Sequence, residues 1–144
     1  MVNEADVYRG LAEKLNHAPS GALFQRLLRR MLTPEDARLM LALPASLDGL
    51  AQDLGQTPQT LEERLQGLVA KGLVVRRRRG YVLPQNVPHL HDGVLTGSEV
   101  DPRVCDLWRE LRQAEAQTWV NWLTERETIQ FRVIPAWRAL ETVT

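Results

Sequence analysis

Apolar residues recur at helical spacing through the first 32 residues of the chain. Val7, Leu11 and Leu15 follow one another every four residues, which predicts a helix that begins after Asn3. A second helix is predicted after Ser20, because its apolar side is continuous: Leu23, Phe24, Leu27, Leu28, Met31 and Leu32. We therefore expect an N-terminal helical extension over residues 1–32.

Three helix-start signals divide the following stretch into three short helices. Each signal is a hydroxyl residue that can cap a helix, and two of them precede a proline, which favours the first helical position. The signals are Thr33–Pro34, Ser46 and Thr57–Pro58. The helix predicted over 57–70 is the longest of the three, and its leucines recur at spacings of four and three.

The pattern then changes from helical to extended. Residues 73–75 and 81–83 are rich in valine and leucine, which predicts two short strands. The turn between them, residues 76–80, contains four consecutive arginines and a glycine. Pro84 cannot donate to a sheet ladder and therefore ends the second strand. Residues 33–84 are thus predicted to end in a β-hairpin with an arginine-rich tip.

The order of helix, helix, glycine-containing turn, helix and hairpin is that of a winged helix-turn-helix. In this order, residues 33–84 resemble the winged helix-turn-helix domains of MarR-like and ArsR-like transcriptional regulators. We expect a mainly α fold with a small β-hairpin wing, in which a winged helix-turn-helix is flanked by N- and C-terminal helices. The resemblance implies DNA binding, although winged helices also serve as protein-interaction modules.

The distribution of charge along the chain makes the wing the main candidate for contact with DNA. The 144 residues contain 18 basic and 18 acidic side chains, so no basic footprint marks the chain as a whole. Residues 33–84 contain seven basic and six acidic residues, and four of the seven are the arginines of the turn. Without the arginines 76–79 this segment is net acidic.

Two sets of residues are the predicted DNA-binding site. The helix over 57–70 would lie in the major groove, and its polar side chains would meet base edges and phosphates: Thr57, Gln59, Thr60, Glu63 and Gln66. The wing would hold the backbone or enter the minor groove through Arg76, Arg77, Arg78 and Arg79. Glu62 and Glu63 oppose this interpretation because their carboxylates repel phosphate. The rival hypothesis is a protein-interaction module, in which the arginines would pair with acids on a partner protein.

The C-terminal third is predicted to begin with a loop and continue as a long helix. Prolines and glycines in residues 85–101 indicate a linker loop. Residues 102–144 are expected to form a tryptophan-rich helix to about residue 124 and a terminal strand at 129–133. We expect this helix to form a homodimer interface, or alternatively to fold back on the first two helices. The residues predicted for the interface are Leu107, Trp108, Leu111, Trp119 and Trp122.

A second resemblance concerns the order of elements over the whole chain. The helical start, the winged helix that ends in residues 82–84 (VLP), the tryptophan-bearing helix and residues 132–135 (RVIP) resemble the N-terminal region of certain ferredoxin-type redox proteins. In that family a [4Fe–4S] segment with clustered cysteines follows, and this chain has only Cys105. The resemblance therefore implies no iron–sulfur cluster in this chain. It suggests an alternative function, in which the chain is an adaptor or accessory subunit of an iron–sulfur redox system and has a redox protein as its partner. The chain would then be a truncated or a free-standing version of that region.

Other kinds of chemistry have little support in the sequence. His89 and His91 lie within sixteen residues of Cys105, and a metal site can be imagined there, but metal sites normally gather more ligands at tighter spacing. We expect two loop histidines and a small thiol, with no bound metal and no cofactor. No nucleotide-binding, hydrolase or metalloprotease motif is present, so we expect no enzyme activity. The sequence lacks a signal peptide or membrane span, and we expect a cytoplasmic protein.

Overall fold

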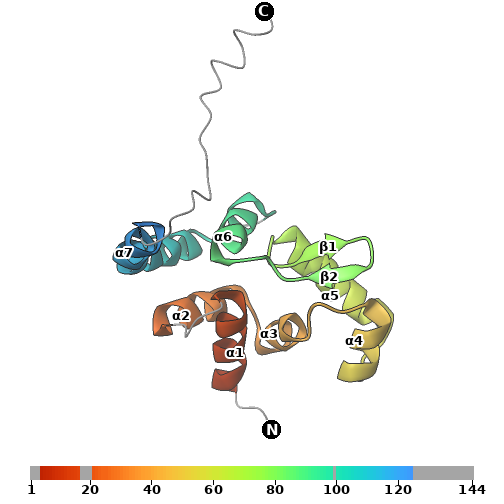
Figure 1. Ribbon diagram of the computed structural model, residues 1–144. Helices are drawn as coiled ribbons and strands as arrows, with labels where there is room; N and C mark the ends of the chain where they lie inside the picture. Colours follow the sequence, from red (N-terminus) through yellow and green to blue (C-terminus); the bar gives the residue numbers. More distant parts are fainter. Residues whose placement is uncertain (1–3, 17–20, 99, 125–144) are drawn as a thin grey trace, which may run out of the picture. The chain divides into compact units, whose positions relative to one another are not determined.

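The computed structural model describes residues 4–16, 21–98 and 100–124. These residues form seven α-helices and one two-stranded antiparallel sheet (Figure 1). In chain order the elements are α1 (Glu4–Asn16), α2 (Ala22–Met31), α3 (Pro34–Leu41), α4 (Leu47–Leu54), α5 (Pro58–Ala70), β1 (Val75–Arg77), β2 (Gly80–Val82), α6 (Val87–Thr96) and α7 (Pro102–Thr124). The predicted fold class is confirmed: the protein is mainly α with a small β wing.

The chain divides into two compact units, Met1–Arg112 and Gln113–Thr144. Every contact described below lies within the first unit. There α1 packs against α2 and α3, and α4 packs against α5. The predicted buried stripe of α1 is confirmed, because the side chains of Val7, Leu11 and Leu15 are at most 1% exposed.

All three predicted caps of the short helices are confirmed. The side chains of Thr33, Ser46 and Thr57 each accept a hydrogen bond from the backbone N–H three residues later. At Thr33 the bond is reciprocal, because Asp36 in turn accepts from the Thr33 backbone N–H. These bonds satisfy amide groups that a helix start otherwise leaves without a partner, and they fix where α3, α4 and α5 begin.

The predicted two-stranded hairpin of the wing is confirmed, and one further residue pairs with its free edge. β1 and β2 pair antiparallel, with Arg76 opposite Tyr81 and Arg77 opposite Gly80. Ala45, in the connection between α3 and α4, forms an isolated bridge with Tyr81 on the other edge of β2. The two residues exchange N–H to O bonds of 3.2 and 3.3 Å. This bridge joins the hairpin to the connection between α3 and α4.

The structure corrects the loop expected at residues 85–101, because α6 occupies most of it. Asn86 caps this helix, and its side chain accepts from the His89 backbone N–H at 2.9 Å. Gly93 of α6 lies directly against Gly72, and a Cβ atom built on either residue would collide with the backbone of the other. The glycines that indicate a loop in the sequence are therefore needed for helix α6 to approach the end of α5 closely.

Helix α7 begins and ends where the sequence predicts. Its first half supplies Val104, Trp108 and Leu111 to the core, and each of these side chains is at most 4% exposed. The strand predicted at 129–133 lies outside the described residues. Within the described ranges, no helix is both long and apolar enough to cross a membrane.

Candidate nucleic-acid interface

Helix α5 has one buried face and one exposed face. Leu61, Leu65 and Leu68 are buried, with exposed fractions between 0 and 4%. The residues predicted for DNA binding at the N-cap of α5 and on the helix itself are all exposed: Thr57, Gln59, Thr60, Glu63 and Gln66. Because the leucines hold the helix against the core, the polar side chains stand on its solvent side. The site predicted on this helix is thus accessible to a ligand.

The polar groups of this face already interact with one another. The Thr57 and Thr60 hydroxyl oxygens lie 2.8 Å apart, and the Thr57 hydroxyl also accepts from the Thr60 backbone N–H. The Gln66 amide donates to a Glu62 carboxylate oxygen at 3.4 Å, a long bond. The Thr57 side chain is therefore engaged in the cap, whereas Gln59 and Glu63 have no side-chain hydrogen bond among the described residues.

Arg64 is directed toward the body of the protein. Its Nε lies 2.9 Å from an Asp36 carboxylate oxygen of α3, and the two side chains are 34% and 16% exposed. Arg64 directly follows Glu62 and Glu63 in the sequence and is the nearest cation that could offset their charge. Because Arg64 is paired with Asp36 of α3 instead, the exposed face of α5 carries its glutamates without a compensating cation from this residue. Since no local signal links positions 36 and 64, sequence reasoning could not find this pair.

The four wing arginines are exposed and uncompensated. Arg76 and Arg77 belong to β1, while Arg78 and Arg79 form the turn. Neighbouring side chains of a strand point to opposite faces of the sheet, so the side chains of Arg76 and Arg77 project from opposite faces of the hairpin. Across the described ranges, no carboxylate oxygen lies within 4.0 Å of a guanidinium nitrogen of any of the four. Four positive charges thus surround the tip of the wing.

Several carboxylates are carried by the two helices that precede the wing. Asp48 and Asp53 of α4 are exposed, as is Glu63 of α5, while Glu62 is half-buried. Phosphate is repelled by such groups and attracted by the wing. The exposed charges of α4 and α5 are therefore opposite in sign to those of the wing, and a polyanion is attracted to the wing rather than to these carboxylates.

Of the five residues predicted for a dimer interface, two lie in the core of the chain itself. Trp108 is 2% exposed, its ring centroid lies 6.4 Å from that of Phe24 of α2, and Leu111 is 4% exposed. Side chains so deeply buried within their own chain offer little surface to a second subunit, and for Trp108 one of the neighbours is Phe24 of α2. Leu107 is half-buried. The side chains of Trp119 and Trp122 lie outside the described ones.

The histidines near the chain's single cysteine take part in local structure. The His89 Nδ1 accepts from the Gln85 backbone N–H at 3.2 Å. The His91 ring packs edge-on against Trp108, with 5.0 Å between the ring centroids, and its Nδ1 lies 3.0 Å from an Asp92 carboxylate oxygen. Both residues belong to α6 and not to the loop that the sequence predicts. In the part of the chain that the structure describes, no three His, Cys, Asp or Glu residues are grouped to hold a metal ion.

Comparison with protein family models, with curated proteins and with solved structures finds no match for this chain.

Proposed function

We propose that this protein is a DNA-binding transcriptional regulator of the winged-helix kind, similar to the MarR-like and ArsR-like proteins. Helix α5 would enter the major groove, and the wing would contact the backbone or the minor groove. The observation that carries the proposal is the wing, which follows α5 after a four-residue connection and carries four exposed arginines with no acidic partner among the described residues. Phosphate is the ligand that such a cluster binds most readily.

The exposed residues of α5 suit base recognition better than phosphate binding. The side-chain amides of Gln59 and Gln66 can each pair with the two groups that adenine presents in the major groove. The methyl group of Thr60 can contact that of thymine, and Glu63 can accept a hydrogen bond from cytosine N4. In this proposal the helix contributes sequence preference, and the wing contributes most of the affinity.

A twofold dimer would place two α5 helices on one duplex and double each contact. We propose Leu107, Trp119 and Trp122 as the interface residues, since Trp108 and Leu111 are used within the chain. Tryptophan is enriched among the residues that contribute most to interface affinity.

The test is fluorescence anisotropy of a labelled mixed-sequence duplex at low and moderate salt. The variant replaces Arg76, Arg77, Arg78 and Arg79 with alanine. The matched control replaces four other exposed arginines, so that the net charge changes equally: Arg9, Arg103, Arg109 and Arg112. If the wild type makes four phosphate contacts, its affinity should fall about 100-fold as the salt concentration rises from about 50 to about 200 mM. Loss of these contacts should reduce the slope of log K against log salt by about 3–4.

The outcomes separate the wing from a general effect of charge. We expect the wing variant to lose most of its affinity and its salt dependence, and the control to retain both. If the two variants lose affinity equally, the wing has no special role. If the wild type does not bind even at low salt, the DNA-binding proposal is wrong.

The acidic side chains on α4 and α5 favour a second candidate, a protein-interaction module. Asp48, Asp53 and Glu63 offer exposed carboxylates where a DNA-binding helix usually carries basic residues. An adaptor that joins an iron–sulfur redox protein would use the wing arginines against acids on that partner. Failure of the anisotropy experiment at low salt, together with a pull-down of a partner that is lost in the wing variant, would support this second function.

A further inference from the structure

Lys14, in the last turn of α1, binds the backbone at the point where α3 ends. Its ammonium donates hydrogen bonds to the carbonyl oxygens of Leu41 and Leu43, at 2.6 and 2.5 Å. Leu41 is the last residue of α3, and the carbonyl groups of a last helical turn have no partner within their own helix. A cation at this end also interacts favourably with the helix dipole. Lys14 therefore holds the end of α3 to α1 and fixes the direction in which the chain leaves α3.

The charge of Lys14 acts on these backbone groups and not on an acidic side chain. No carboxylate oxygen of the described residues lies within 4.0 Å of its Nζ. Hydrogen bonds from an ionised donor are shorter than those between neutral groups and about twice as strong. The bond to the Leu43 carbonyl oxygen is partly buried, where water competes less for the donor. These two bonds are therefore strong enough to restrain the segment that they hold.

The segment held by Lys14 leads directly to the contact with the wing. Ala45 follows Leu43 by two residues and exchanges two backbone hydrogen bonds with Tyr81 of β2. Gly80 lies against the same residue, because a Cβ atom built on it would be 2.5 Å from the Ala45 carbonyl oxygen. Strand β2 is thus in direct contact with the Ala45 backbone, and a displacement of Ala45 must displace β2.

The register of the hairpin links this contact to the arginines of the wing. Tyr81 is opposite Arg76, and Gly80 is opposite Arg77. The paired backbones of Ala45, Tyr81 and Arg76 therefore form one row, which runs from the connection after α3 to the first strand of the wing. The orientation of the arginines relative to the helices consequently depends on where Ala45 is held.

We propose that Lys14 is a positioning residue for the wing. By holding the carbonyl groups of Leu41 and Leu43, it keeps Ala45 where β2 can pair with it. Helix α1 is then a working part of the nucleic-acid-binding unit, although Lys14 itself contacts no ligand. The effect of Lys14 on the bridge can be measured without DNA, whereas its effect on DNA affinity rests on the function proposed above.

Amide hydrogen exchange of the full chain, followed by NMR without DNA, measures how often the bridge opens. Ala45 is half-buried and the bridge is a single residue pair, so the amides of Ala45 and Tyr81 exchange through local opening and not through global unfolding. Lys14→Met keeps the apolar stem and removes the charged donor. We expect these two amides to exchange about tenfold faster in this variant. A residue that contributed only to overall stability would instead accelerate the slowest amides of the core and leave the bridge amides unchanged.

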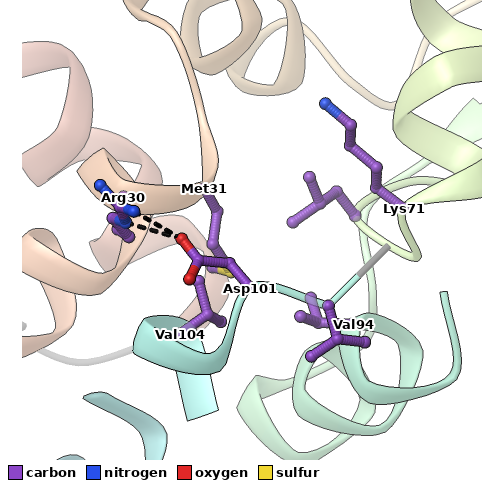
Figure 2. Close-up of a pocket in the computed structure, with 8 residues that line it drawn as sticks. Arg30, Met31, Lys71, Val94, Asp101 and Val104 are labelled. Atoms are coloured by element: carbon purple, nitrogen blue, oxygen red, sulfur yellow. Dashed lines mark hydrogen bonds and ion pairs between the residues drawn. The ribbon is translucent and has the colours of Figure 1, made fainter. Parts of the chain in front are cut away.

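Arg30→Met is the matched control, because it removes the same charge and the same number of hydrogen bonds. Arg30 donates two bonds, of 2.9 and 2.6 Å, to one carboxylate oxygen of Asp101 (Figure 2). This pair joins α2 to the start of α7 and does not involve the end of α3. Lys14→Arg is the conservative variant, since it keeps the charge and can donate to two oxygens. Both variants should leave the exchange of the bridge amides within about twofold of the wild-type rate.

A second measurement connects the bridge to DNA. Fluorescence anisotropy with the mixed-sequence duplex should show about fivefold weaker binding of Lys14→Met at low salt, and a slope of log K against log salt that is reduced by about 1–2. Arg30→Met, which has the same net charge, should keep the wild-type affinity and slope.

Unchanged exchange of the bridge amides in Lys14→Met would overturn the inference, because the bridge would then persist without Lys14. Equal acceleration in Arg30→Met would also overturn it, since the effect would follow from any lost charge. Faster exchange with unchanged affinity, in a protein whose wing arginines do bind DNA, would show that the bridge does not orient the wing for DNA. If the wild type does not bind DNA, the proposed function is wrong, and the exchange experiment alone decides whether Lys14 holds the wing.

Discussion

Gly80 is the position where a single methyl group should do the most damage to the wing. Its φ of 139° lies in a region that residues with a side chain rarely adopt, and a Cβ atom would lie 2.5 Å from the Ala45 carbonyl oxygen. The backbone strain costs about 1–3 kcal/mol in such positions. To relieve the collision, β2 must move away from Ala45, which breaks the two hydrogen bonds between Ala45 and Tyr81, each worth about 0.5–1.5 kcal/mol. Together these terms lower the free energy of unfolding of Gly80→Ala by about 2–6 kcal/mol.

Urea unfolding followed by circular dichroism measures this loss, and Gly67→Ala is the matched control. Gly67 lies in the interior of α5 and is exposed, and a methyl group at this position would have no atom within 4 Å beyond its own helix backbone and chain neighbours. Alanine is favoured over glycine in an exposed helix by about 0.5–1 kcal/mol, so this variant should be more stable than the wild type. Glycine to alanine is thus expected to lower the free energy of unfolding at position 80 and to raise it at position 67.

The reasoning is refuted if Gly80→Ala unfolds at the same urea concentration as the wild type with an unchanged slope. That result would mean that β2 does not pair with Ala45 in solution. A destabilised Gly67→Ala would instead indicate that α5 is not exposed at this position.

Two further predictions concern a helix cap and an ion pair. Ser46→Ala removes the bond to the Gly49 backbone N–H at 3.2 Å and should lower the free energy of unfolding by about 1 kcal/mol, measured by urea unfolding at neutral pH. The pKa of Asp101 is lowered in the folded protein, so its stabilising contribution is present above 3.8 and is lost as the pH falls through the folded-state pKa. Urea unfolding at a series of acidic pH values should therefore show a shallower loss of stability for Asp101→Asn than for the wild type; parallel curves would contradict this assignment.

The elements that can be predicted from the sequence are those whose signals are local. Thr33, Ser46 and Thr57 cap helices through bonds to residues three positions away, and a capping pattern of this length can be read without knowledge of the fold. The buried stripes of α1 and α5 are likewise local, because they depend only on helical spacing. The exposed face of α5 and the arginines of the wing could be located for the same reason.

Two of the features that sequence reasoning missed involve contacts between distant residues. The bridge between Ala45 and Tyr81 joins positions 36 residues apart and involves a single residue on one side, too little to produce a strand pattern. The sequence predicts a loop in place of α6 because glycine and proline usually interrupt helices, whereas the contact of Gly93 with Gly72 requires a residue without a side chain there. The signal that could have identified α6 is Asn86 followed by Pro88, which resembles the cap-and-proline pattern of α3 and α5.

The most direct test of the proposed function is a backbone amide NMR titration of the full chain with a short mixed-sequence duplex at low salt. The account predicts that the largest shift changes fall on residues 57–66 of α5 and 75–82 of the wing, and that they diminish as salt is added. Changes confined to α6 and the first half of α7 would contradict it, because DNA would then contact a face that lacks the arginine cluster. The absence of any change at low salt would also contradict it and would favour a protein partner for this domain.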